Sequence, residues 1–368
     1  MSNGTRFAAL GGVVVAGVLA LSACGTDENT SPSSGGGAAA GSGNCVKATV
    51  NAAGSSAQAN AVTEWIKGYQ SGCAGANLNY NPSGSGAGVQ SFISGQVAFA
   101  GSDSALKPDE VTPAKQRCQG NNALNLPMVV GPVAVAYNLR GLSDLQLSPT
   151  TIANIFSGKI TKWNDPAIKK DNPNATLPDT AVKSVHRSDE SGTTDNFTSF
   201  LAATAPDVWK FEPGKKWTAP GGQGGTKSDG VTTVIKQTDG AIGYIEMSYA
   251  TQAKLNTAKV ANGSGEFVAL STDSASKALE GAEITGTGND LSMKIDYATK
   301  TAGAYPIVLV TYEIVCEKGL PSEQSQFVKS FLTYTSSSAG QNVLAGLGYA
   351  PLPPAVLTKV QNAVKALA

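Results

Sequence analysis

The feature that most limits the fold of this chain is a regular alternation between short apolar runs and segments of helical periodicity. Such an alternation is typical of α/β architecture with mostly parallel sheets. The helical patterns span residues 57–71, 148–157, 193–204, 228–238, 322–336 and 353–367. Because open parallel sheets bind ligands outside the carboxyl ends of their strands, the turns that follow the apolar runs are the first candidates for a site.

The turn after the β-like run 182–186 carries an arginine, several hydroxyl groups and a glycine between Arg187 and Phe197. Phe197, Phe200 and Leu201 repeat at helical spacing, which places the turn at a helix N-terminus. Backbone N–H groups and the helix dipole favour an anion there, and arginine adds a planar fork that suits phosphate or carboxylate. Taken alone, the segment is equally compatible with residues that only cap the helix.

Two further turns rich in glycine and serine follow strand-like runs. Segment 83–88 precedes a helical start, but it lacks the Lys-Ser/Thr of a P-loop and the glycine spacing of the dinucleotide fingerprint. Segment 54–57 lies between the strand-like residues 46–50 and another helix. Three helix N-termini that carry hydroxyl groups could converge on one small anion.

Asp103 ends the strand-like run 99–103. A carboxylate that faces an anion site repels the ligand unless the ligand has a proton to donate. Hydrogen phosphate carries such a proton near neutral pH, and sulfate does not. Asp103 would therefore select phosphate by accepting its proton, although an aspartate at a strand end is more often a turn former or a helix cap.

With these residues in view, the chain resembles the phosphate-binding proteins of ABC-type phosphate importers, above all their lipid-anchored actinobacterial forms. The resemblance runs from about Cys45 to the C-terminus and is most specific at residues 84–88, 101–103, 187–197 and 239–244. It implies an α/β, two-lobed periplasmic-binding-protein-like fold (type II) with mixed, mostly parallel sheets and an interdomain cleft. It also implies a monomeric receptor, without cofactor or enzymatic activity, that passes inorganic phosphate to transmembrane permease subunits.

The resemblance also implies which residues contact the anion. The phosphate contacts would be Ser56, the Ala57 backbone, Ser85, Asp103, Arg187, Ser191, Gly192 and Thr193. Asp189 matches the acid that pairs with and orients the site arginine. Many family members have Thr-Phe-Pro where this chain has Ser-Ala-Gln at residues 56–58, a change that keeps a backbone N–H contact but alters the rim.

Length and composition leave room for two lobes, because 368 residues with 41% hydrophobic and 15% charged content can form two cores. Two β-branched runs, 126–139 and 305–316, are by resemblance the crossings between the lobes. Lobe I would then comprise residues 45–130 plus 305–368, and lobe II residues 131–304.

The N-terminus predicts export and lipidation. Arg6 precedes the apolar run 7–21, and Leu-Ser-Ala then precedes Cys24, as in a bacterial lipoprotein signal peptide spanning residues 1–23. Cys24 would carry the lipid that holds the protein on the extracytoplasmic face of the cell membrane. The small and polar composition of residues 24–44 predicts a flexible tether.

Setting Cys24 aside from the 5 cysteines leaves four, an even number that suits an exported protein, and four cysteines allow three pairings. Cys45 with Cys73 is favoured, because each precedes a strand-like run and adjacent parallel strands start at the same edge. Cys118 with Cys316 follows by elimination, and the other pairings stay open. No metal site is expected, since the sequence has no Cys-x-x-Cys spacing and His186 is its single histidine.

Other functional classes fit less well. The 27 basic and 27 acidic residues cancel, and no basic cluster interleaves with aromatics, so nucleic acid is not an expected partner. The main alternative is a hydrolase acting on phosphate esters through Asp103, Asp189 and Ser191, but a lone histidine has no second group to orient it. The Ser-x-x-Lys at residues 104–107 lacks its partner motifs. A structural or adhesive lipoprotein explains the anchor but not the oxyanion donors.

Overall fold

The computed structural model describes residues 45–368. The predicted signal peptide 1–23, the lipidated Cys24 and the tether 24–44 lie outside the described residues. Within residues 45–368, no helix is both long and apolar enough to span a bilayer.

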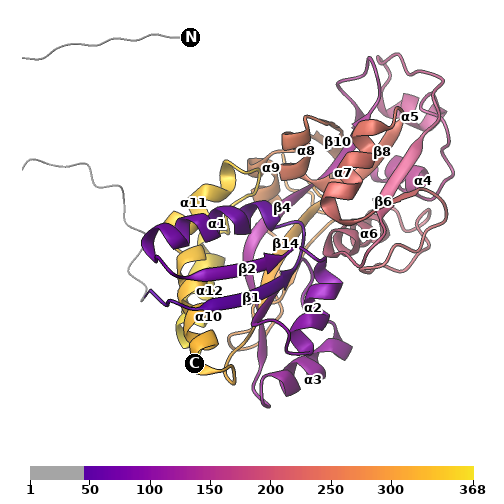
Figure 1. Cartoon of the computed structure of the whole chain (residues 1–368). Coiled ribbons are helices and arrows are strands. Elements are labelled where there is room, and N and C mark those ends of the chain that lie inside the picture. Colours follow the sequence, from indigo (N-terminus) through magenta and orange to yellow (C-terminus); the bar gives the residue numbers. More distant parts are fainter. Residues whose placement is uncertain (1–44) are drawn as a thin grey trace, which may run out of the picture. The chain divides into compact units, whose positions relative to one another are not determined.

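Strands and helices alternate along most of the chain, as the periodicity predicts (Figure 1). The strands are β1 (Thr49–Gly54), β2 (Asn77–Asn81), β3 (Phe99–Ser102), β4 (Ala123–Asn138), β5 (Gln146–Leu147), β6 (Lys183–Arg187), β7 (Gln223–Gly225), β8 (Ala241–Glu246), β9 (Asn256–Thr257), β10 (Lys259–Ala261), β11 (Phe267–Val268), β12 (Glu283–Ile284), β13 (Met293–Lys294) and β14 (Val308–Cys316). The helices are α1 (Ala59–Gly72), α2 (Ser85–Ile93), α3 (Pro108–Arg117), α4 (Pro149–Phe156), α5 (Pro166–Asp171), α6 (Gly192–Thr204), α7 (Lys227–Gln237), α8 (Met247–Ala253), α9 (Thr272–Ala278), α10 (Ser322–Thr335), α11 (Ser338–Ala345) and α12 (Pro354–Ala366). Each helix expected from the sequence begins and ends within a residue or two of its predicted bounds.

The main sheet is 9-stranded, with the order β2-β1-β3-β14-β4-β8-β6-β7 and β9 paired to β4. The outer strands β2, β1 and β3 pair in parallel, as do β8, β6 and β7. The centre differs, because β14 pairs antiparallel with both β3 and β4, and β4 pairs antiparallel with β8. The sheet is therefore mixed: β4 and β14 carry the chain in opposite directions between two parallel groups.

Two large hydrophobic cores lie along this sheet. The first contains Trp65, Phe99 and Phe331, and the second contains Trp163 and Phe197. Strand β4 contributes to both, with its residues up to Val130 in the first core and Val133, Val135 and Tyr137 in the second. Ala275 of α9, which falls within the predicted lobe II, packs in the first core. The lobe boundary near residue 304 therefore stays a prediction.

Residues 45–368 contain two disulfides, in the pairing that the sequence favours. Cys45 bonds to Cys73 and Cys118 bonds to Cys316, with Cα atoms 5.3 Å apart in each pair. The pairs join residues separated by 28 and 198 positions, so the second closes much the longer loop.

Replacing Cys118 and Cys316 together by Ala should lower the free energy of unfolding by about 2 to 4 kcal/mol, because the unfolded chain regains the freedom of a long loop. Denaturant unfolding of the exported protein measures this loss. Peptide mapping without reductant provides the check on connectivity, and free thiols at both members of a pair would contradict it.

Candidate functional site

The predicted anion-binding residues lie at the carboxyl ends of strands β1, β2, β3 and β6, in the turns that follow them or in the first turn of the next helix. All are buried: no side chain among them exposes more than 3% of its surface. The set is Ser56, Ala57, Ser85, Asp103, Arg187, Ser191, Gly192 and Thr193.

Asp103 lies at the centre of a group of hydroxyl donors. Its Oδ1 accepts hydrogen bonds from Ser55 Oγ at 2.5 Å and Thr311 Oγ1 at 2.7 Å, and its Oδ2 accepts one from Ser85 Oγ at 3.0 Å. Burial raises the pKa of Asp103 to about 6, although these hydrogen bonds oppose the shift. The carboxyl group is therefore mainly ionised at neutral pH and can only accept protons there.

Arg187 is held by a two-pronged ion pair with Asp189. Nε donates to Oδ1 at 2.8 Å and Nη2 donates to Oδ2 at 2.6 Å, while the Lys227 backbone N–H donates to Oδ1 at 2.9 Å. Burial lowers the pKa of Arg187, but the hydrogen bond and charge of Asp189 outweigh burial, and the net pKa is raised. Asp189 thus pairs with Arg187, and its role in orienting the arginine toward a ligand stays a prediction.

Two glycines allow the segments that carry these charges to approach closely. Gly84 has φ +98°, and a Cβ there would lie 2.6 Å from Asp189 Oδ2. At Gly192, a Cβ would lie 2.5 Å from Asp103 Cβ and 2.8 Å from Ser85 Oγ. Larger residues would force the segments apart, so the glycines help to bring residues distant in sequence into one buried place.

The hydroxyl groups of the site already have partners within the protein. Ser191 is the N-cap of α6, where its Oγ accepts from Thr193 N at 3.1 Å, so the capping interpretation applies to this residue. Ser56 Oγ lies 2.9 Å from Ser228 Oγ. The Ala57 N–H, expected to face the anion, donates to Ser55 Oγ at 3.0 Å. Helix capping does not explain why Arg187 is buried, because its side chain pairs with Asp189.

Sequence reasoning missed four polar residues around the site. Ser55 could have been found from the sequence, because it directly precedes Ser56. Glu246 ends strand β8, which begins within the segment 239–244 that carries part of the resemblance. Thr311 and Glu313 lie within a long buried strand, β14, where no local pattern marks them as functional.

Glu313 is a buried acid on β14, opposite Gly101 of β3. Burial raises its pKa to about 8, the charge of Asp103 adds to the shift, and a hydrogen bond from Gln58 opposes it. The native protein thus keeps this proton to a higher pH than the unfolded chain does. Its contribution to stability is complete below the ordinary pKa of glutamate and is lost as pH rises through about 8.

Glu313→Gln should therefore stabilise the protein more at pH 8 than at pH 5, because the amide imitates the neutral acid and cannot ionise. The gain in melting temperature should be at least ~2 °C larger at the higher pH. Thermal unfolding at both pH values measures it, with Glu283→Gln at an exposed position as the control. Equal shifts for Glu313→Gln at the two pH values would show that this acid does not retain its proton.

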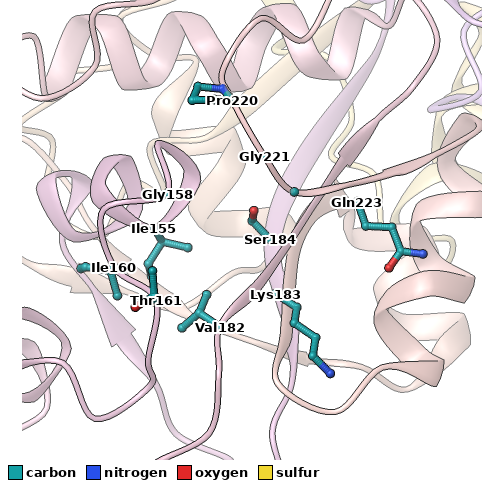
Figure 2. A pocket seen from close by; sticks show the side chains of 11 residues that line it. Ile155, Gly158, Ile160, Thr161, Val182, Lys183, Ser184, Pro220, Gly221 and Gln223 are labelled. Atoms are coloured by element: carbon teal, nitrogen blue, oxygen red, sulfur yellow. The ribbon is translucent and has the colours of Figure 1, made fainter.

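Two cavities differ in their relation to the predicted anion-binding residues. Figure 2 shows one of about 340 Å³, between the end of α4, the start of β6 and the loop 220–223. Ile155, Ile160 and Val182 form its apolar part, and no predicted phosphate contact lines it. A cavity of about 480 Å³ borders Asp103 on the side of Lys107 and Asp195.

The lone histidine, which the hydrolase alternative would need as a base, is engaged by other groups. His186 lies with Nδ1 2.9 Å from the Arg187 backbone oxygen, and its ring stacks on Trp217 at 5.0 Å. The Ser191 hydroxyl caps α6. Residues 45–368 also contain no group of His, Cys, Asp and Glu side chains placed to hold a metal ion.

A two-lobed α/β fold with oppositely charged groups buried at strand ends defines a solute-binding protein of the periplasmic-binding-protein type. The model of the PBP superfamily domain matches residues 37–339, and the chain belongs to that superfamily and to its family of actinobacterial phosphate-binding proteins.

The similarity to named relatives extends over nearly the whole chain. Phosphate-binding protein PstS 3 of Mycobacterium tuberculosis is 44% identical, with 99% of each chain covered. Its counterpart in Mycobacterium leprae is 43% identical with the same coverage. A solved high-affinity periplasmic phosphate-binding protein, PfluDING with bound phosphate, has a TM-score of 0.71 at 22% identity, covering 86% of this chain and 93% of its own, and shares the fold.

Proposed function

We propose that this protein is an extracytoplasmic receptor that binds inorganic phosphate, as hydrogen phosphate, between two lobes and delivers it to an ABC-type permease. The observation that carries the proposal is that an acceptor-only carboxylate, Asp103, and a buried arginine, Arg187, both lie among the buried groups at the strand ends. Arg187 supplies charge-assisted donors for the anion, and Asp103 accepts the proton that a fully ionised oxyanion lacks. The names of the close relatives support the same ligand.

The proposed contacts are Ser56, the Ala57 backbone, Ser85, Asp103, Arg187, Ser191, Gly192 and Thr193. Because these residues are buried, phosphate would enter only when the lobes, 45–130 plus 305–368 and 131–304, move apart. Two ion pairs would hold the lobes together on closure. They join Lys107 to Asp195 at 2.8 Å and Lys215 to Glu110 at 2.9 Å.

Anchoring through a lipid on Cys24 would keep the receptor at the membrane that holds its permease. One myristoyl-sized chain binds membranes only marginally, so stable anchoring would need more than one acyl chain on the modified residue. Cys24→Ser should release the protein from the membrane fraction, and its retention there would count against lipidation.

Calorimetric titration of the protein with phosphate and with sulfate tests the proposed function. We expect saturable binding of phosphate and much weaker binding of sulfate at the same pH and salt concentration. Absence of phosphate binding, or equal affinity for both anions, would contradict the proposal. A chromogenic phosphate ester serves as a parallel test, since a receptor should bind phosphate without turning the ester over.

A further inference from the structure

Thr311 is a fully buried residue in the middle of β14 whose hydroxyl group reaches the proposed phosphate site. Its neighbours along the strand, Val310 and Tyr312, pack in the first core, so Thr311 points to the opposite face of the sheet. There its Oγ1 donates a hydrogen bond to Asp103 Oδ1 at 2.7 Å. The pairing of β14 with β4 also shifts register between Thr311 and Tyr312, and such an irregularity re-aims the side chains next to it.

The two oxygens of the Asp103 carboxylate differ in the hydrogen bonds that they accept. Oδ1 accepts one from Ser55 Oγ at 2.5 Å and one from Thr311 Oγ1. Among the described residues, Oδ2 accepts only the hydrogen bond from Ser85 Oγ, at the longer distance of 3.0 Å. Because each carboxylate oxygen has two lone-pair positions, Oδ1 is fully occupied and Oδ2 keeps one position open.

Oδ2 is also the oxygen that borders the predicted anion contacts. A Cβ at Gly192 would lie 2.8 Å from Asp103 Oδ2 and 2.8 Å from Ser85 Oγ. Gly192 is the first residue of α6, at the end of the helix where backbone N–H groups favour an anion. Oδ1 is held instead by groups from β14 and from the turn after β1.

We propose that Thr311 sets the phosphate selectivity of the site by occupying Asp103 Oδ1, together with Ser55, so that Oδ2 alone is left to accept the proton of the ligand. The inference rests on the proposed function. Hydrogen phosphate fills the one open position with its proton, whereas sulfate has no proton to place there and meets the charge of the carboxylate. Thr311 is thus a positioning residue, which acts on the ligand only through Asp103.

The same hydrogen bond helps to keep Asp103 ionised. Burial raises the pKa of Asp103 to about 6, and the hydrogen bonds from Ser55 and Thr311 oppose the shift. Loss of the Thr311 donor should therefore raise this pKa further. A neutral Asp103 carries a proton that it can donate to sulfate, so the site should begin to accept sulfate at a higher pH.

The affinity for sulfate as a function of pH tests this role, because sulfate takes up no proton near neutral pH. In the parent, sulfate binding should strengthen as pH falls through about 6. In Thr311→Val it should strengthen from a higher pH, so that at about pH 7 the variant binds sulfate about threefold or more tighter than the parent. Calorimetric titration, with sulfate competing against phosphate, measures these affinities. Loss of packing alone would not tighten the binding of sulfate.

Three further variants isolate the hydroxyl group. Thr311→Ser keeps a donor at this position and should restore the sulfate profile of the parent. Thr335→Val is the matched control, since Thr335 is equally buried but donates to the Leu332 backbone oxygen within α10, and its profile should match that of the parent. If Thr311→Val does not fold, Ser55→Ala removes the other donor to Oδ1 and should shift the profile in the same direction.

The other titratable groups that act on Asp103 are unchanged by the substitutions at position 311. Glu246, at the end of β8, adds to the rise in the pKa of Asp103. Glu313 on β14, Tyr80 on β2 and Tyr349 also interact with the charge of Asp103. A difference between the parent and Thr311→Val that Thr311→Ser removes therefore comes from the hydroxyl donor.

The outcomes separate this inference from the proposed function. If the parent binds phosphate, and folded Thr311→Val binds sulfate with the same pH dependence as the parent, the role of Thr311 is overturned and the receptor function stands. Failure of the parent to bind phosphate overturns the proposed function, and this inference with it.

Discussion

Arg187→Ala is expected to weaken phosphate binding by about 3 to 5 kcal/mol, a loss of more than a hundredfold in affinity. The side chain exposes only 2% of its surface, so its charge acts where water screens little. Truncation removes the charge-assisted donors and leaves Asp189 without its partner, adding a second negative charge near the anion. Calorimetric titration of phosphate into parent and variant measures the change.

Two variants sharpen this test. Arg187→Lys should recover little affinity, because an ammonium group cannot form the fork that both oxygens of Asp189 accept. Arg140→Ala removes an exposed arginine and should bind phosphate as the parent does. If a folded Arg187→Ala binds phosphate as tightly as the parent, the site lies elsewhere.

Asp103→Asn should weaken phosphate modestly and narrow the gap between phosphate and sulfate. The ionised carboxylate of Asp103 can only accept a hydrogen bond, whereas the amide of the variant can also donate one to a fully ionised oxyanion. Ser55 and Thr311 can still donate to the remaining oxygen, so the variant should fold. The measurement is the ratio of the two affinities in parent and variant, at fixed pH and salt.

The same residue predicts a pH dependence of selectivity. Since the pKa of Asp103 is raised to about 6, the preference of the parent for phosphate should decline as pH falls through that value. Asp103→Asn should show no such decline. At neutral pH, phosphate at a hundredfold excess over its dissociation constant should stabilise the parent by about 2.7 kcal/mol, far more than sulfate at equal concentration. If the ratio of phosphate affinity to sulfate affinity is the same in Asp103→Asn as in the parent, Asp103 is only a structural residue.

The sequence predicted those parts of the fold and site that depend on local patterns. Hydrophobic periodicity defined the helices, and turn chemistry drew attention to Asp103 and Arg187, each of which lies within a few residues of its own strand end. Thr311 could not be found in this way. It reaches Asp103 only because β14 pairs antiparallel with β3, in a register that sets Tyr312 opposite Ser102.

Glu246 was missed for a related reason. It contacts Thr193, a residue 53 positions away on the first turn of α6, and only the fold brings the two together. The antiparallel pairing at the centre of the sheet could not be predicted either. A long apolar run indicates that a strand is buried, but not whether its neighbours run parallel or antiparallel to it.

Strand β4 runs for 16 residues without a break and contributes side chains to both hydrophobic cores, as β14 also does. If one core unfolded, β4 and β14 would lose part of their pairing, and the other core would lose part of the strands that it packs against. The two halves should therefore melt together, in a single heat-absorption peak, even though the proposed receptor would open and close between them. Ligand binding at their junction would then protect the whole described fold against unfolding and proteolysis, including segments far from phosphate.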